Sequence, residues 1–249
     1  MCEKCAATDA GALSRRRLLS LGAGLGAGVA LALAAGGAAA DDCAPFDPAM
    51  QAATTPDAAI GLLAAGNARF AAGQSARCDL VGQLAATAGR QAPFACVLSC
   101  IDSRVAPEIV FDQQIGDIFV ARVAGNVATP EVIGSIEYAT KAAGARAVVV
   151  LGHTHCGAVK GAVDRADIGA NLTGLLDLIE PAIAATPLEG MRSSDNRAFV
   201  AAVAETNVRR TVAAMTADSP VIAGMVAAGE VTVVGAMFDL ETGRVRFLV

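Results

Sequence analysis

The chain has 249 residues, of which 54% are hydrophobic, and it carries a net charge of −5. This length is sufficient for one sizeable hydrophobic core, and the apolar content excludes an intrinsically disordered chain. Beyond the three arginines at 15–17, this acidic chain has no basic run and so offers no electrostatic footprint for nucleic acid. We therefore expect a small-molecule substrate.

Part of the hydrophobicity belongs to a targeting segment. Residues 14–40 read SRRRLLSLGAGLGAGVALALAAGGAAA, a cationic start followed by an apolar stretch that ends in small residues. The start resembles a twin-arginine export signal, with Leu18 where that motif more often has phenylalanine. The stretch is long enough for a membrane anchor, but the alanines before Asp41 are typical of cleavage. We expect a cleaved signal over residues 1–40, use of the export machinery, a periplasmic location, and a single domain over 41–249.

Cleavage would leave an acidic protein with five cysteines. It removes four of the 19 basic and two of the 24 acidic side chains, which leaves 15 and 22 and a net charge of −7. Free thiols oxidise after export, so a bound metal would explain why some persist. Cys43 and Cys78 are candidates for a disulfide, although sequence cannot establish their separation. Cys96 is interpreted as a buried core residue.

The remaining chain alternates between two hydrophobic patterns. After a loop-like stretch near residues 45–56, helical spacing predicts helices over 57–73, 131–143, 170–185 and 196–217. Between them, short runs that are apolar on both faces predict buried parallel strands over 94–99, 118–123, 147–151 and 231–236. The ending FDLETGRVRFLV predicts an edge hairpin that turns at 241–243. The pattern therefore predicts an α/β fold, a mostly parallel sheet flanked by helices.

Three possible metal ligands lie near the ends of these strands. Cys100 and His153 each follow a predicted strand, so both emerge at the carboxyl edge of the sheet, where ligand sites form. Cys156 lies at the start of the predicted helix, directly before GAVKGAV, where exposed backbone N–H groups favour a thiolate. Two thiolates and an imidazole form a good zinc set, and three protein ligands leave the fourth position open.

The stretch CIDSR adds two charged residues beside Cys100. Asp102 and Arg104 alternate with Cys100, so an extended segment places all three on one side. The Asp102 carboxylate could be a fourth metal ligand in a closed state, or the Arg104 guanidinium could hold it away from the metal. Taken alone, the pair would be an ordinary structural ion pair; the neighbouring cysteine favours a function.

With CxDSR followed by HxxC, the chain resembles the β-class carbonic anhydrases. The likeness covers about residues 58–249 and continues through GDIFVARVAGN, GSIEYA, VLGHTHCGAVK, ETNVRRTV and GAMFDLETGRV. The resemblance implies that Cys100, His153 and Cys156 bind Zn²⁺ and that Asp102 and Arg104 form a catalytic dyad. The implied reaction is the reversible hydration of carbon dioxide to bicarbonate and a proton, through hydroxide on the zinc.

The resemblance also implies residues and partners outside the dyad. Gln114, next to Gln113, falls where plant-type members contact substrate across a dimer interface, which implies a homodimer or higher oligomer. Gly157 could lend a backbone N–H to substrate. His155 is interpreted as a solvent-facing residue next to the metal ligands, and the alternative is that it acts as a proton shuttle. The chain has 0 Trp, so the tryptophan-containing bicarbonate pocket that closes some members cannot exist in its usual form, and we expect an open zinc site near neutral pH.

Two other functions remain compatible with these motifs. Proteins that resemble this fold hydrolyse carbonyl sulfide or carbon disulfide with the same ligands, and substrate access separates them from hydratases. A non-catalytic zinc-binding or redox protein is the second alternative. Structural zinc sites are closed by four protein ligands, so this alternative depends on Asp102 remaining on the metal.

Overall fold

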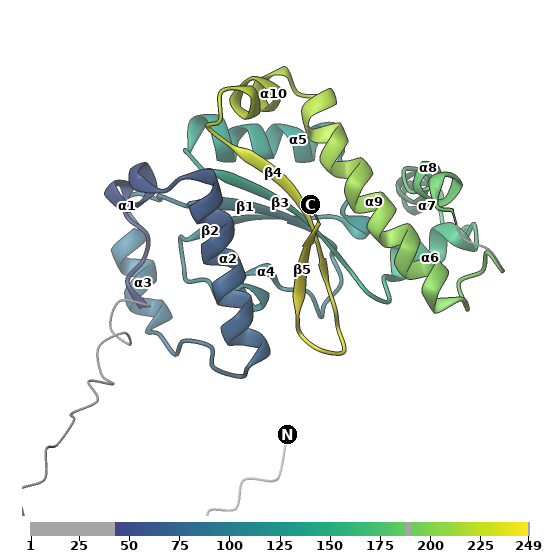
Figure 1. Cartoon of the computed structure of the whole chain (residues 1–249), viewed down its shortest axis with the longest axis horizontal. Coiled ribbons are helices and arrows are strands. Elements are labelled where there is room, and N and C mark those ends of the chain that lie inside the picture. Colours follow the sequence, from purple (N-terminus) through teal and green to yellow (C-terminus); the bar gives the residue numbers. More distant parts are fainter. Residues whose placement is uncertain (1–42, 188–190, 249) are drawn as a thin grey trace, which may run out of the picture. The chain divides into compact units, whose positions relative to one another are not determined.

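A five-stranded sheet organises residues 43–187 and 191–248, which are the residues that the computed structural model describes (Figure 1). The strand order is β2-β1-β3-β4-β5, with the first four strands parallel and β5 antiparallel to β4. The strands are β1 (Ala95–Ser99), β2 (Ile118–Arg122), β3 (Ala147–His153), β4 (Thr232–Phe238) and β5 (Val245–Leu248). The predicted α/β fold, its mostly parallel sheet and its C-terminal hairpin are confirmed.

The prediction that the strands are buried on both faces is correct for the central strands β1 and β3 and wrong for the edge strand β2. Every residue of β1 and β3 is buried. Most of β2 is only half-buried, and its last residue, Arg122, is exposed. The prediction that residues 118–123 are buried on both faces is therefore wrong, because β2 is the first strand in the sheet order and has a neighbour on one side only.

Helices cover both faces of the sheet. Their bounds are α1 (Pro48–Ala53), α2 (Pro56–Ala71), α3 (Leu80–Thr87), α4 (Pro107–Val110), α5 (Pro130–Glu137), α6 (Gly157–Val163), α7 (Ala170–Asp177), α8 (Glu180–Ala185), α9 (Arg197–Ala217) and α10 (Pro220–Ala227). The predicted loop near 45–56 contains α1, which begins with an Asp47 cap and a proline in its first turn. The single helix predicted over 170–185 is wrong: Pro181 lacks a backbone N–H and lies in the first turn of a separate helix, α8.

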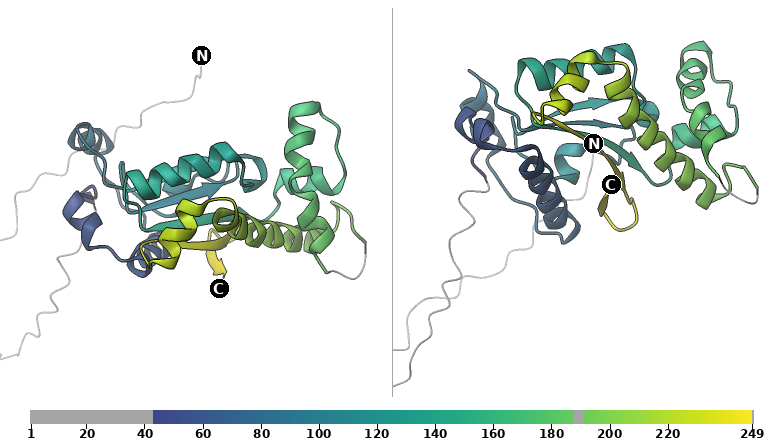
Figure 2. Two further views of the ribbon diagram at one scale, coloured as in Figure 1. Left: turned by 90° about the horizontal axis from the view of Figure 1, so that it is seen from above. Right: turned by 45° about the horizontal axis from the view of Figure 1, so that its top comes forward.

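Two apolar clusters pack against opposite faces of the sheet. The ribbon views of Figure 2 show helices on both of these faces. Val148 and Val150 pack in one cluster with Phe199 of α9, whereas Val149 and Leu151 pack in the other with α2. This alternation follows from the two-residue period of a strand. Because both faces of β3 are packed, the residues at its carboxyl end are held on a rigid support.

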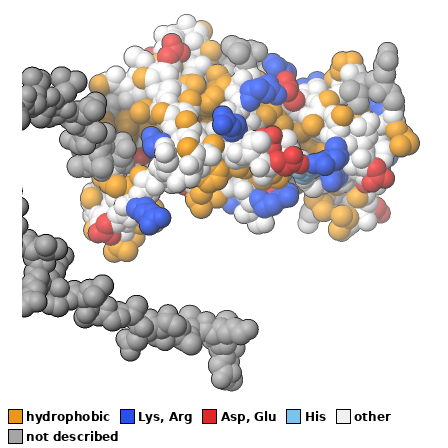
Figure 3. Space-filling model, turned by 60° about the horizontal axis from the view of Figure 1, so that its bottom comes forward, with side chains coloured by type: hydrophobic (Ala, Val, Ile, Leu, Met, Phe, Trp, Pro, Cys, Tyr) orange, Lys and Arg blue, Asp and Glu red, His pale blue; other side chains and the backbone are white. Residues whose placement is uncertain are grey.

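The predicted targeting segment over residues 1–40 lies outside the described residues. Among the described residues, no helix has both the length and the apolar character required to cross a membrane. On the face drawn in Figure 3, basic and acidic side chains lie interspersed without an extended basic surface.

A disulfide joins the start of the described chain to the segment before α3. Cys43 and Cys78, a sequence separation of 35, are bonded to each other, while Cys96, Cys100 and Cys156 are free and buried. The sequence could not decide whether Cys43 and Cys78 are bonded, and the structure shows that they are. Cys96 is a buried core residue, as expected.

Removing this disulfide is expected to destabilise the protein. The double variant Cys43→Ser, Cys78→Ser should unfold with a free energy about 3–4 kcal/mol lower, since the crosslink no longer restricts the unfolded chain. Urea unfolding with and without reductant measures this effect, and reductant should affect only the parent protein. Equal unfolding midpoints for the oxidised parent and the double variant would contradict the prediction.

Candidate active site

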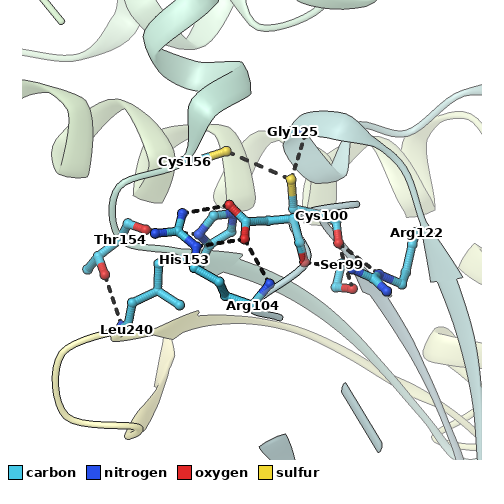
Figure 4. Close-up of polar contacts among 10 residues, drawn as sticks. Ser99, Cys100, Arg104, Arg122, Gly125, His153, Thr154, Cys156 and Leu240 are labelled. Carbon is cyan, nitrogen blue, oxygen red and sulfur yellow. Dashed lines mark hydrogen bonds and ion pairs between the residues drawn. The ribbon is translucent and has the colours of Figure 1, made fainter. Parts of the chain in front are cut away.

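The carboxyl edge of the sheet brings three ligand-type side chains together. Cys100 follows β1, His153 is the last residue of β3, and Cys156 caps the start of α6. All three are buried, and their ligand atoms lie within 4.8 Å of one another. The two sulfur atoms are 3.9 Å apart (Figure 4). These three residues, called the Cys–His–Cys group below, meet although 53 positions separate the first two.

The imidazole of His153 is oriented for a cation. Its Nδ1 lies 2.9 Å from the carbonyl oxygen of Thr154, which can only accept, so Nδ1 carries the proton. The opposite nitrogen, Nε2, is buried without a hydrogen-bond partner among the described residues. A buried polar atom left unpaired costs about 1–3 kcal/mol. A metal ion would satisfy this lone pair, and the donor set of two sulfurs and one imidazole suits zinc.

The sulfur of Cys100 is held by a backbone donor. The N–H of Gly125 donates to Sγ over 3.4 Å, and the side chain of Asn207 donates to the Gly125 carbonyl over 2.7 Å. Gly125 has a φ of +73°, and a Cβ there would lie 2.6 Å from Ile179. The position therefore needs glycine for both conformation and space. No spacing pattern in the sequence pointed to the donor role of Gly125 or to Asn207.

The two thiols are linked by the hydrogen bond between their sulfur atoms. The hydrogen bond from Cys156 lowers the pKa of Cys100 to about 4, against the opposing effect of burial. The same hydrogen bond, and then burial, raises the pKa of Cys156. A cation between the sulfurs would replace the proton of this hydrogen bond and stabilise both thiolates.

Asp102 and Arg104 form a tightly bonded pair beside the Cys–His–Cys group. The guanidinium donates from Nε to Oδ1 over 2.9 Å and from Nη2 to Oδ2 over 2.7 Å, and the Arg104 backbone N–H donates to Oδ1 over 3.0 Å. These hydrogen bonds, chiefly those from the Arg104 side chain, lower the pKa of Asp102 to about 2. Oδ2 is 3.9 Å from Nε2 of His153. An ionised carboxylate therefore lies next to the group, with Arg104 bonded to both of its oxygens.

Gly157 lies at the site, whereas Gln114 does not. Gly157 is the exposed first residue of α6, directly after Cys156. Gln114 precedes β2, whose first residue pairs with Ala95 at the amino edge, so Gln114 lies at the opposite edge from Cys100. There it is buried, and its Oε1 accepts a hydrogen bond from Gln83 over 3.2 Å. The structure thus does not bring Gln114 to the Cys–His–Cys group of its own chain.

His155 has partners that the sequence did not reveal. Its Nε2 lies 2.9 Å from Nη2 of Arg197 and 3.2 Å from Oε1 of Glu241, and these two residues also pair with each other. The residue has a φ of +58°, in the left-handed region that few residues other than glycine adopt. His155 is thus held in a charged cluster at the surface instead of projecting freely into solvent.

The variant His155→Ala is expected to keep its turnover at every buffer concentration. Because Arg197 and Glu241 both contact Nε2, we expect that nitrogen to be unavailable for proton transfer. Carbon dioxide hydration in buffers from low to high concentration measures this, and turnover should stay within about twofold of the parent. A fall seen at low buffer alone, and removed by added buffer, would instead make His155 a proton shuttle.

Comparison with known proteins agrees with this geometry. A family model described as carbonic anhydrase matches residues 95–245. Carbonic anhydrase 2 of Mycobacterium tuberculosis is 39% identical over 192 residues, which are 77% of this chain and 92% of that protein. The carbonic anhydrase of Mycolicibacterium smegmatis is 40% identical over 194 residues, 78% and 93% of the two chains. A crystal structure of a β-carbonic anhydrase of Aspergillus fumigatus matches with a TM-score of 0.61 and 27% identity, covering 68% of this chain and 81% of that one.

An α/β sheet with a buried Cys–His–Cys group and an ionised carboxylate at its carboxyl edge is the arrangement of an enzyme site that has the ligands for a metal ion. The chain belongs to the β-class carbonic anhydrases, which catalyse the reversible hydration of carbon dioxide to bicarbonate and a proton. The family indicated by the sequence motifs is confirmed.

Proposed function

We propose that the chain hydrates carbon dioxide with a zinc ion held by Cys100, His153 and Cys156. The observation that carries this proposal is the buried Nε2 of His153, which lacks a protein partner beside two sulfurs 3.9 Å apart. When bound, zinc supplies a Lewis acid that lowers the pKa of a coordinated water to about 7. Three protein ligands leave that position available.

The dyad residues have separate roles in the proposed reaction. Asp102, ionised at neutral pH, accepts a hydrogen bond from the attacking oxygen and so directs its lone pair toward the carbon of the substrate. Arg104 holds Asp102 with two side-chain hydrogen bonds and keeps it from becoming a fourth ligand. This arrangement supports an open site near neutral pH. The backbone N–H of Gly157 is available to an oxygen of carbon dioxide or bicarbonate.

A homodimer would give Gln114 a role that it cannot have within one chain. Gln114 lies at the opposite edge from the Cys–His–Cys group, so its expected contact with substrate requires a second copy. Exposed apolar side chains, Leu80 and Ile109, line a cavity of about 390 Å³ together with Gln114. A relative from Sordaria macrospora, 26% identical over 77% of this chain and 92% of its own with a TM-score of 0.58, is described as tetrameric. These features support self-association.

We also propose that residues 1–40 direct export to the periplasm by the twin-arginine route and are then removed, leaving residues 41–249 as the catalytic domain. The disulfide between Cys43 and Cys78 supports this, because disulfides persist in oxidising compartments. Fractionation of cells and N-terminal sequencing of the product test the proposal. An intact N-terminus in the cytoplasmic fraction would contradict it.

The proposed activity is tested against the sulfur substrates in one preparation. The protein should contain one zinc per chain, and its carbon dioxide hydration should disappear with chelation and return with added zinc. Sulfide release from carbonyl sulfide and carbon disulfide is measured in the same sample. A zinc-loaded protein that releases sulfide but does not hydrate carbon dioxide would replace the proposed substrate.

A further inference from the structure

The side chain of Arg122 donates hydrogen bonds to two backbone carbonyls, those of Cys100 and Asp102. Its Nε donates to the carbonyl oxygen of Cys100 over 3.0 Å, and its Nη2 donates to the carbonyl oxygen of Asp102 over 2.6 Å (Figure 4). Arg122 is the last residue of β2 and pairs with Ser99, the last residue of β1. The sheet register therefore places this guanidinium directly beside the chain as it leaves β1.

The backbone of this segment, residues 100–102, makes few other hydrogen bonds, one of which runs from Oγ of Ser99 to the Cys100 carbonyl over 3.4 Å. Strand pairing ends at Ser99, and Ile101, between Cys100 and Asp102, is 65% exposed and so adds little packing. The carbonyl of Asp102 also accepts from the N–H of Val105 over 3.0 Å. Arg122 is bonded to the carbonyls of both Cys100 and Asp102 and so links the two ends of this segment. The backbone conformation that it holds sets the separation between the Cys100 sulfur and the Asp102 carboxylate.

We propose that Arg122 is a positioning residue, which aligns the Asp102 carboxylate with the Cys–His–Cys group through the backbone of residues 100–102. The inference rests on the proposed function and names a group that the sequence motifs did not single out. Arginine suits this task because its planar guanidinium presents several donors in a fixed geometry. A lysine would keep the charge at the same edge but offers a single ammonium, which cannot reproduce two donors at that spacing.

The test compares Arg122→Lys and Arg122→Ala with the parent protein, with zinc content measured in each sample. Loss of a residue that orients a metal site typically costs 10–100-fold. We expect kcat per bound zinc to fall about 10–100-fold in both variants, while KM stays within about threefold because no substrate contact is removed. Ethylguanidinium, and not ethylamine, should restore part of the activity of Arg122→Ala. Arg165→Lys, which alters an exposed arginine paired with Glu180, is the matched control and should match the parent.

A kcat per bound zinc within twofold of the parent in Arg122→Lys would overturn the inference, even if that variant melts at a lower temperature. If the zinc-loaded parent itself fails to hydrate carbon dioxide, the proposed function fails separately. Zinc affinity, measured by competition with a chromophoric chelator, then decides the inference. A dissociation constant about tenfold weaker in Arg122→Lys supports it, and an unchanged constant overturns it.

Discussion

The variant His153→Ala is expected to lose both bound zinc and carbon dioxide hydration. Without the imidazole, two sulfurs 3.9 Å apart remain, and two ligands do not hold zinc at a catalytic site. Activity should fall to the uncatalysed rate, because no other group among the described residues is placed to lower the pKa of a water beside Asp102. Metal analysis after gel filtration and stopped-flow hydration with a pH indicator measure the two effects.

His155→Ala is the control for His153→Ala. It removes the other histidine of the chain, whose side chain contacts Arg197 and Glu241. This control should retain one zinc per chain. Full zinc content in His153→Ala, with parental activity, would show that the metal is held elsewhere.

The variant Asp102→Asn is expected to keep its zinc and lose about 10²–10⁴-fold in kcat, the range that a positioned proton acceptor contributes. Asparagine has nearly the same shape, but its amide cannot accept on both sides as the carboxylate does. Arg104 holds the pKa of Asp102 at about 2, so the carboxylate is already ionised from pH 5 to 9. The change should therefore lower the plateau of the pH–kcat profile without moving its midpoint.

Two results would contradict this role for Asp102. A zinc-loaded Asp102→Asn protein with parental kcat would make the pair with Arg104 a structural ion pair, which is how the two residues would be interpreted without the neighbouring cysteine. A shifted midpoint with an unchanged plateau would make Asp102 a group that tunes the metal site instead of a proton acceptor.

The sequence predicted those parts of the fold that depend on local pattern. The runs around β1 and β3 are apolar throughout because both faces are buried, and this composition identifies central parallel strands. A similar composition in β2 led to the wrong prediction that this strand is buried on both faces. A hydrophobic run does not reveal that its strand lies at the edge of the sheet. Residues 170–185 were predicted as one helix although they contain Pro181, because the helical spacing of apolar residues continues across the break between α7 and α8.

The candidate site was predictable where sequence motifs carry the chemistry. Cys100 and His153 follow strands, so the parallel topology alone brings them to one edge. Contacts between distant segments leave no such signal. The hydrogen bond from Asn207 to Gly125 depends on how α9 packs against residues 124–126. The hydrogen bonds from Arg122 to the backbone of residues 100–102 depend on the pairing of β2 with β1.

Stopped-flow hydration of carbon dioxide by the zinc-loaded parent protein, at neutral and alkaline pH, tests the central claim most directly. Zinc is measured in the same sample, so that inactivity cannot be attributed to a missing metal. We predict rapid turnover that rises with pH and disappears in His153→Ala. A parent protein with one zinc per chain and no hydration above the uncatalysed rate across that pH range would contradict the assignment.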